Sequence, residues 1–102
     1  MLETVISKPI YRVLADLTQQ SRMEVALPLA VKELVSLKLA EADGHCQVFE
    51  DRYGMNFESF RTSWSDGRIS KPHSYEVERD YWEWEAAVTD QQKLAQMLDS
   101  LA

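Results

Sequence analysis

The sequence predicts a mainly α-helical protein that forms a single small domain. Apolar residues recur at helical spacing in several segments, and residues typical of helix starts and stops separate these segments. The chain has 102 residues, of which 45% are hydrophobic and 27% are charged, so its length allows one small hydrophobic core. We expect a long helix, a short aromatic helix and an acidic, aromatic C-terminal helix.

The first elements are a short extended segment and a helix. Residues 2–7 are rich in β-branched side chains, which favours either a short N-terminal strand or an extended arm. Ser7, Lys8 and Pro9 are typical of a helix start. Apolar residues then recur at helical spacing as far as Gln19 or Gln20, namely Ile10, Val13, Leu14 and Leu17.

A second, long helix is expected from Pro28 to Tyr53. Proline disfavours the helical conformation in the residue before it and suits a first helical turn, whereas Gly54 can adopt the left-handed conformation that ends a helix. Gly44 costs about 1 kcal/mol relative to alanine inside a helix, so a break or kink there stays open. The residues expected to face a core are Val31, Leu34, Leu37, Val48 and Phe49.

A short aromatic helix is expected after Asn56, which is a typical N-cap residue. Within it, Phe57, Phe60 and Trp64 share one face and are expected to act as a structural hinge into the C-terminal segment. Gly67 would end this helix.

The last helix is expected to follow a linker over residues 68–73, in which Pro72 keeps Lys71 extended. Ser74 would cap this helix, which would run from Tyr75 to Leu101. An interruption at residues 89–90 stays open.

Charge and aromatic residues are concentrated in the second part of the chain. The net charge is −6; residues 1–38 hold five basic and four acidic residues (+1), and residues 39–102 hold six basic and thirteen acidic residues (−7). Nine of the ten aromatic residues lie within residues 49–84. We therefore divide the domain into a helical core or dimerisation region, 1–54, and an acidic, aromatic partner-binding region, 55–102.

Residues capable of catalysis or metal binding are sparse. Zinc sites usually have four protein ligands, or three and a water, whereas this chain offers the adjacent His45 and Cys46 and the distant His73. Its three glycines stand alone, so there is no phosphate-binding glycine loop, and acidic pairs are expected by chance among 17 acids. We expect no enzyme activity, no metal and no cofactor. A single cysteine and the lack of a membrane-length apolar run favour the cytoplasm.

The C-terminal helix carries large side chains on two faces. At 100° per residue, Val77, Tyr81 and Trp84 cluster on one side, whereas Tyr75 and Trp82 lie on the other. A small domain covers one face of a terminal helix readily, and both only with difficulty. Either both faces pack within the monomer or a homodimer, or one face binds another protein.

We expect the second arrangement, because Trp and Tyr are common at binding hot spots and the acids complement a basic surface. The expected partner-binding residues are Tyr75, Glu76, Val77, Glu78, Asp80, Tyr81, Trp82, Glu83, Trp84 and Glu85.

The N-terminal region allows a DNA-binding alternative. A strand, a helix, a turn and a second helix occur in that order in ribbon-helix-helix dimers, with residues 4–7 as the ribbon. Pro28 would then lie inside the second helix, at a cost of about 3 kcal/mol, and the ribbon offers few DNA-contacting side chains. We favour a dimerisation or core-forming role, through Leu14, Leu17, Val31, Leu34 and Leu37.

Two stretches resemble a known class of small prokaryotic proteins. They are YGMNFESF at residues 53–60, followed by Trp64 and Gly67, and YEVERDYWEWE at residues 75–85. The resemblance is to antitoxin-like proteins of two-gene toxin–antitoxin modules, which carry a YGM-S-x-E-E-F segment followed by an acidic segment ending in Trp. It covers roughly residues 27–90, and this chain departs from the pattern at Asn56 and Ser59.

The resemblance implies a binding protein without catalysis, which neutralises a small basic toxin encoded by a neighbouring gene. The alternatives are a homo-oligomeric helical protein of structural role and a ribbon-helix-helix regulator.

Overall fold

The computed structural model describes residues 6–101, and in this range it contains helices and no strand. The mainly α-helical fold class is therefore confirmed. Most of the segment for which a strand was considered, residues 2–7, lies outside the described range. The four helices are α1 (Lys8–Thr18), α2 (Met23–Tyr53), α3 (Phe57–Ser65) and α4 (Tyr75–Ser100).

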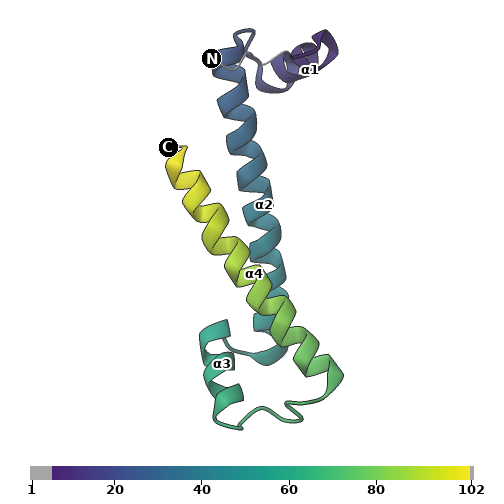
Figure 1. Cartoon of the computed structure of the whole chain (residues 1–102), viewed down its shortest axis with the longest axis vertical. Helices are drawn as coiled ribbons and strands as arrows, with labels where there is room; N and C mark the ends of the chain where they lie inside the picture. The colour runs from purple at the N-terminus through teal and green to yellow at the C-terminus, as the bar shows by residue number, and fades with distance from the viewer. Residues whose placement is uncertain (1–5, 102) are drawn as a thin grey trace.

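The molecule is elongated, with α2 as its longest element. Its extents are 57 × 22 × 22 Å. Helix α4 runs antiparallel to α2 along the C-terminal part of that helix, α3 packs beside the start of α4, and α1 lies across the N-terminal end of α2 (Figure 1). The radius of gyration is 19.6 Å, well above the roughly 13 Å of a compact domain of 100 residues. Much of the helical surface is therefore exposed.

Helix α1 begins where the sequence predicts and ends close to the predicted position. Pro9 lies in its first turn, where a missing N–H group leaves no hydrogen bond unmade, and Gln19 ends it with a left-handed φ of 57°. The Tyr11 hydroxyl donates a hydrogen bond to the carbonyl of Ser21, which ties α1 to the start of α2.

The predicted start of α2 at Pro28 is wrong. The helix begins five residues earlier, at Met23, and Pro28 lies inside it. The Arg22 carbonyl accepts the N–H group of Ala26 at 2.8 Å, so the first turn is closed before the proline removes a donor. Pro28 therefore no longer argues against a ribbon-helix-helix arrangement. Residues 4 and 5, half of its ribbon, lie outside the described residues.

Helix α2 continues through Gly44 without a break and ends at Tyr53. Ala42 and Cys46, on either side of the glycine, are buried, and this packing holds the helix in place. Gly54 ends it as predicted, with a φ of 66° and its N–H group 2.7 Å from the Glu50 carbonyl.

The ends of α3 are formed by the residues that the sequence indicates. Asn56 Oδ1 accepts a hydrogen bond from the Ser59 N–H group at 2.9 Å. At the other end Gly67 has a φ of 72°, and the Arg68 N–H group donates to the Ser63 carbonyl at 2.8 Å. A hydrogen bond of this kind is typical of a helix C-terminus that is followed by a residue in the left-handed conformation, here Gly67.

Helix α4 begins after Ser74, whose Oγ accepts a hydrogen bond from the Val77 N–H group at 3.3 Å, and it runs without interruption to Ser100. The expected extended conformation of Lys71 is wrong. Its φ is 50°, and its carbonyl accepts the Ser74 N–H group at 3.0 Å. A turn thus brings the chain into the helix.

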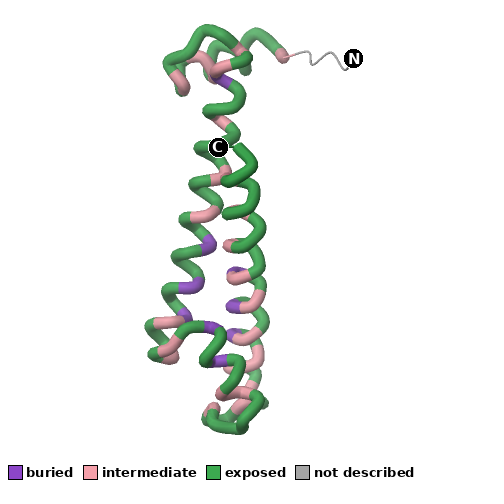
Figure 2. The backbone as a smooth tube through the Cα atoms, turned by 90° about the vertical axis from the view of Figure 1, so that its left-hand side faces the viewer, coloured by how far each residue is buried: buried purple, intermediate pink, exposed green. Residues whose placement is uncertain are grey.

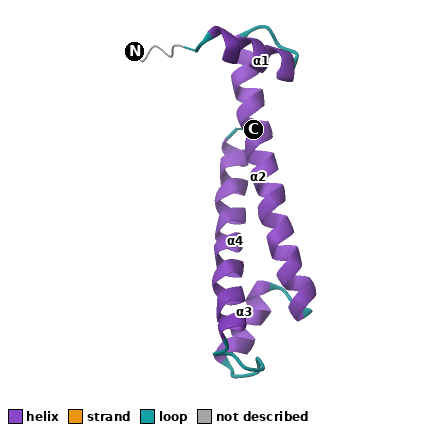
Figure 3. Cartoon of the chain, turned by 90° about the vertical axis from the view of Figure 1, so that its right-hand side faces the viewer, coloured by secondary structure: helices purple, strands orange, loops and turns teal. Residues whose placement is uncertain are grey.

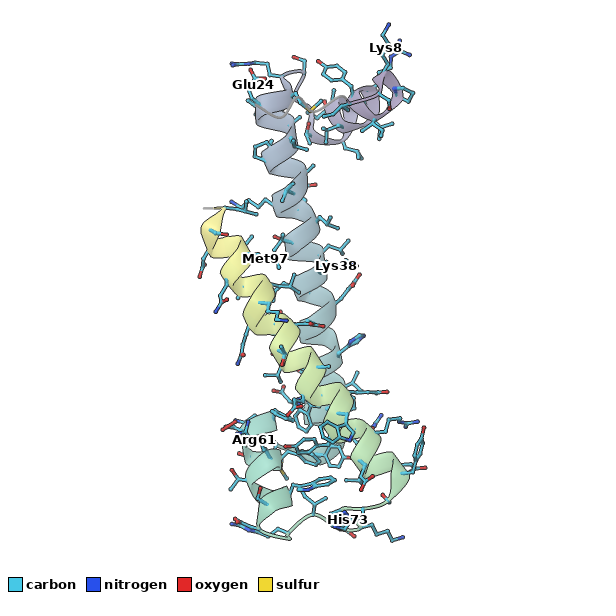
Figure 4. The ribbon with its side chains drawn as sticks, viewed as in Figure 1. Lys8, Glu24, Lys38, Arg61, His73 and Met97 are labelled. Carbon is cyan, nitrogen blue, oxygen red and sulfur yellow. The ribbon has the colours of Figure 1, made fainter. Side chains whose placement is uncertain are left out.

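The main core lies where α2, α3 and α4 meet. Buried positions gather there (Figure 2), and the side chains of the three helices point toward one another (Figure 4). At the centre is Trp84, which has no exposed surface and is surrounded by rings from α2 and α3. The Trp84 ring centroid lies 5.1 Å from that of Phe60, 5.3 Å from Phe57 and 5.6 Å from Phe49. The core draws on residues from both sides of position 54. The buried residues of this cluster are Cys46, Phe49, Phe57, Phe60, Trp84 and Ala87.

Candidate partner-binding surface

Helix α4 turns one aromatic face to the core and another to the solvent. Val77 and Tyr81 are half-buried against the core, and Trp84 is fully buried. On the other side Tyr75 is 77% exposed and Trp82 is 64% exposed. The two faces are thus separated as the helical spacing predicts. Within a single chain, only one of them is covered.

Two of the expected partner-binding residues lie in the interior, which corrects the prediction for them. Trp84 is enclosed by Phe49, Phe57 and Phe60, and Asp80 is only 3% exposed. The short helix α3 and the end of α2 pack on α4 and cover both side chains. They therefore stabilise the fold and are not available to a partner in this conformation.

The Asp80 carboxylate is held by two residues from the end of α2. Its Oδ2 atom accepts a hydrogen bond from the Tyr53 hydroxyl at 2.6 Å and one from Arg52 at 2.7 Å. Burial raises the pKa of Asp80, but these hydrogen bonds and the positive charge of Arg52 outweigh burial, so the pKa lies below its usual value. Burial and the hydrogen bond to Asp80 raise the pKa of Tyr53 to about 12.

The roles of Arg52 and Tyr53 were not predicted from the sequence. They precede Asp80 by 28 and 27 residues, and no local pattern connects the two segments. The link ties the end of α2 to the first turns of α4.

A hollow of about 310 Å³ lies between α4 and the segment before it. Its lining includes the rings of Trp64 and Tyr81, whose centroids are 4.9 Å apart. Trp82 packs edge-on against Tyr81 at 5.5 Å. We name this feature the aromatic hollow; it is lined by Trp64, His73, Glu78, Tyr81 and Trp82.

The aromatic hollow is lined by the carboxylate of Glu78 and the imidazole of His73 as well as by the aromatic rings. His73 Nδ1 lies 3.4 Å from Glu78 Oε1; Figure 4 labels His73 on the loop that precedes α4. Aromatic faces attract cations, and a carboxylate adds a charged hydrogen-bond acceptor. The hollow therefore suits an ammonium or guanidinium side chain. The sequence predicts Trp64 as part of the structural hinge and His73 as part of a linker, and it indicates neither of them as a binding residue.

The remaining acids of α4 surround the exposed rings. Glu76 and Glu83 are exposed, and Glu78 and Glu85 are half-buried. Glu76 and Glu78 also lie in the first turn of α4, where a negative charge stabilises the helix dipole. These two acids thus have a role in the fold as well as a place on the surface.

The residues considered for metal binding or catalysis do not form a site. Cys46 is buried in the core, and this burial raises the pKa of its thiol, which lowers its reactivity. Among residues 6–101, no group of three or more His, Cys, Asp or Glu side chains is arranged to hold a metal ion.

Comparisons with known protein families, with curated proteins and with solved structures find no match to this chain. None of the helices in the described range is long and apolar enough to cross a membrane.

Proposed function

We propose that this chain is an antitoxin-like protein-binding module that neutralises a small basic protein through the exposed face of α4. The observation that carries the proposal is the contrast between two tryptophans of one helix. Trp84 is fully buried, whereas Trp82 is 64% exposed beside Tyr81 and Glu78. An exposed tryptophan in a hollow among other rings and an acid is typical of a hot spot for another protein.

The chemistry of this surface favours a positively charged partner. Residues 39–102 carry a net charge of −7, and the aromatic hollow combines three rings with the carboxylate of Glu78. An arginine or lysine of the partner would stack on the rings and pair with Glu78. A toxin that acts on RNA would present such a surface, because phosphate binding requires Lys and Arg. The antitoxin role itself rests on the resemblance of residues 53–60 and 75–85.

Co-expression with the product of the neighbouring gene tests this proposal. Trp82→Ala and Glu78→Lys should each reduce the recovery of the co-purified protein at least tenfold, because they remove a hot-spot ring and reverse the charge in the hollow. Met97→Ala, an exposed residue near the far end of α4, is the matched control and should retain the partner. Circular dichroism should show unchanged helicity in all three variants. Undiminished recovery with both Trp82→Ala and Glu78→Lys would refute the proposed surface.

The second candidate is a homo-oligomeric helical protein of structural role. It is favoured by the aliphatic side chains that α1 and the start of α2 expose. The ribbon-helix-helix regulator stays a prediction, because half of its ribbon, residues 4 and 5, lies outside the described residues.

A further inference from the structure

Helix α1 has an apolar face that is largely exposed in the part of the chain that the structure describes. Ile10, Val13 and Leu17 lie at spacings of three and four residues and so share one face, and Leu17 is 72% exposed. Leu14 and Thr18, toward one edge of this face, are half-buried. In a soluble protein, the apolar face of an amphipathic helix normally faces a core.

The start of α2, which contacts α1, carries a second set of exposed apolar side chains. Leu27, Val31 and Leu34 follow at spacings of four and three residues, and all three are exposed. Lys38 of α2 and Met97 of α4, both labelled in Figure 4, line a second pocket between the two helices. Helix α4 ends only one turn after Met97. The N-terminal part of α2 thus extends beyond the end of α4 (Figure 3).

We infer that a second copy of this chain covers this surface and that the protein is a dimer joined at its N-terminal ends. We name the surface the arm surface; it consists of Ile10, Val13, Leu17, Leu27, Val31 and Leu34. Together these side chains expose on the order of 500 Å² of apolar area, a large part of the roughly 800 Å² that each partner contributes to a standard interface. Contiguous apolar patches above a few hundred Å² generally mark interaction sites.

The near-neutral charge of this region favours a second copy over a strongly charged partner. Residues 8–34 hold four basic and three acidic residues, so two such surfaces do not repel each other strongly. A partner of strong charge would find no complementary field there. Two-fold symmetry brings the same patch of each copy together.

The shape of the molecule supports the same arrangement. The acidic, aromatic part lies at the opposite end of a molecule 57 Å long, so a dimer joined through the arm surface keeps the two acidic ends apart. The face of α4 with Trp82 also stays free for another protein. The dimer is therefore compatible with the proposed function, although it does not depend on it.

Sedimentation equilibrium of the full chain tests the inference. The wild-type protein should show a mass twice the 11.8 kDa of one chain. Leu34→Glu and Leu17→Glu should each weaken the dimer at least about thirtyfold, the effect of losing one hot spot. Val48→Glu is the matched control, because Val48 also lies exposed on α2, at 51% against 55% for Leu34, but outside the arm surface. It should remain a dimer.

Three results would overturn the inference. They are a single-chain mass of the wild type at every concentration, a dimer that resists both arm variants, and a dimer that Val48→Glu dissociates as strongly as Leu34→Glu. A loss of helicity in both arm variants but not in Val48→Glu would support it. Leu17 and Leu34 are 72% and 55% exposed in a single chain, so their replacement should cost much more where a second copy covers them.

Discussion

The two ends of the molecule differ in how far their apolar side chains are buried. At the aromatic end, where α2, α3 and α4 meet, Trp84 and Phe60 are fully buried. At the other end, α1 has no buried residue, and its Ile10, Val13 and Leu17 face the solvent. Both ends show regular helical spacing of apolar residues. Spacing thus predicts that a face is apolar, whereas burial requires a second surface of matching length and shape.

The same contrast occurs within α4, over a distance of two residues. Trp82 and Trp84 have the same side chain and lie in the same helix, but only Trp84 points toward α2 and α3. Two residues correspond to a rotation of about 200°, so one covering layer buries one ring and leaves the other exposed. The same substitution at the two positions therefore measures the contribution of burial to stability, because the residue type that is replaced is the same.

The largest expected effect is the loss of stability on removing Trp84. Trp84→Ala should lower the free energy of unfolding by about 3–5 kcal/mol, because it leaves a cavity among Phe49, Phe57 and Phe60. Trp82→Ala should change it by less than about 0.5 kcal/mol, as is usual for exposed positions. Urea denaturation of both variants measures the difference. Equal losses would contradict the assignment of Trp84 to the core and Trp82 to the surface.

A smaller effect is expected from pH at the aromatic end. The pKa of Asp80 is lowered in the folded state, so its contribution to stability is present above the unfolded pKa of about 3.9. It is lost as the pH falls through the folded pKa. For Tyr53 the folded pKa is raised to about 12, so its contribution is present below about pH 10 and is lost as the pH rises toward 12.

Denaturation curves measured across pH check both signs. Asp80→Asn should cost about 1–3 kcal/mol at neutral pH, because it removes a charged hydrogen-bond acceptor, and it should flatten the acid part of the profile. The exposed variant Glu83→Gln is the control and should leave the acid part almost unchanged. An acid profile of Asp80→Asn that matches the wild type would show that another group is responsible.

The smallest expected effect lies in α2, which connects the two ends. Gly44→Ala should stabilise the chain by about 0.5–1 kcal/mol, because alanine is the better helix former and a Cβ atom there meets nothing within 4 Å. Gly54→Ala should destabilise it, because Gly54 has a φ of 66° that other residues adopt with strain. Thermal unfolding compares the two. A destabilising Gly44→Ala would indicate that the uninterrupted helix joining the two ends is under strain.

The sequence by itself determined the local features of this protein. Asn56 and Ser74 as N-caps, and Gly54 and Gly67 as helix ends, could be predicted because each acts on backbone groups a few residues away. The two faces of α4 followed in the same way from helical geometry. The predicted start of α2 is five residues too late because Pro28 is the strongest local signal, although a turn closed by the Arg22 carbonyl precedes it.

Only the tertiary structure decided which apolar faces are covered. The burial of Trp84 and Asp80 depends on α3 and on Arg52 and Tyr53, which are 27 or 28 residues from Asp80 in the sequence. The aromatic hollow likewise combines Trp64 and His73 with α4. The length of α4 relative to α2 leaves the arm surface exposed. Such contacts depend on how the helices pack in three dimensions, and no pattern of neighbouring residues specifies that packing.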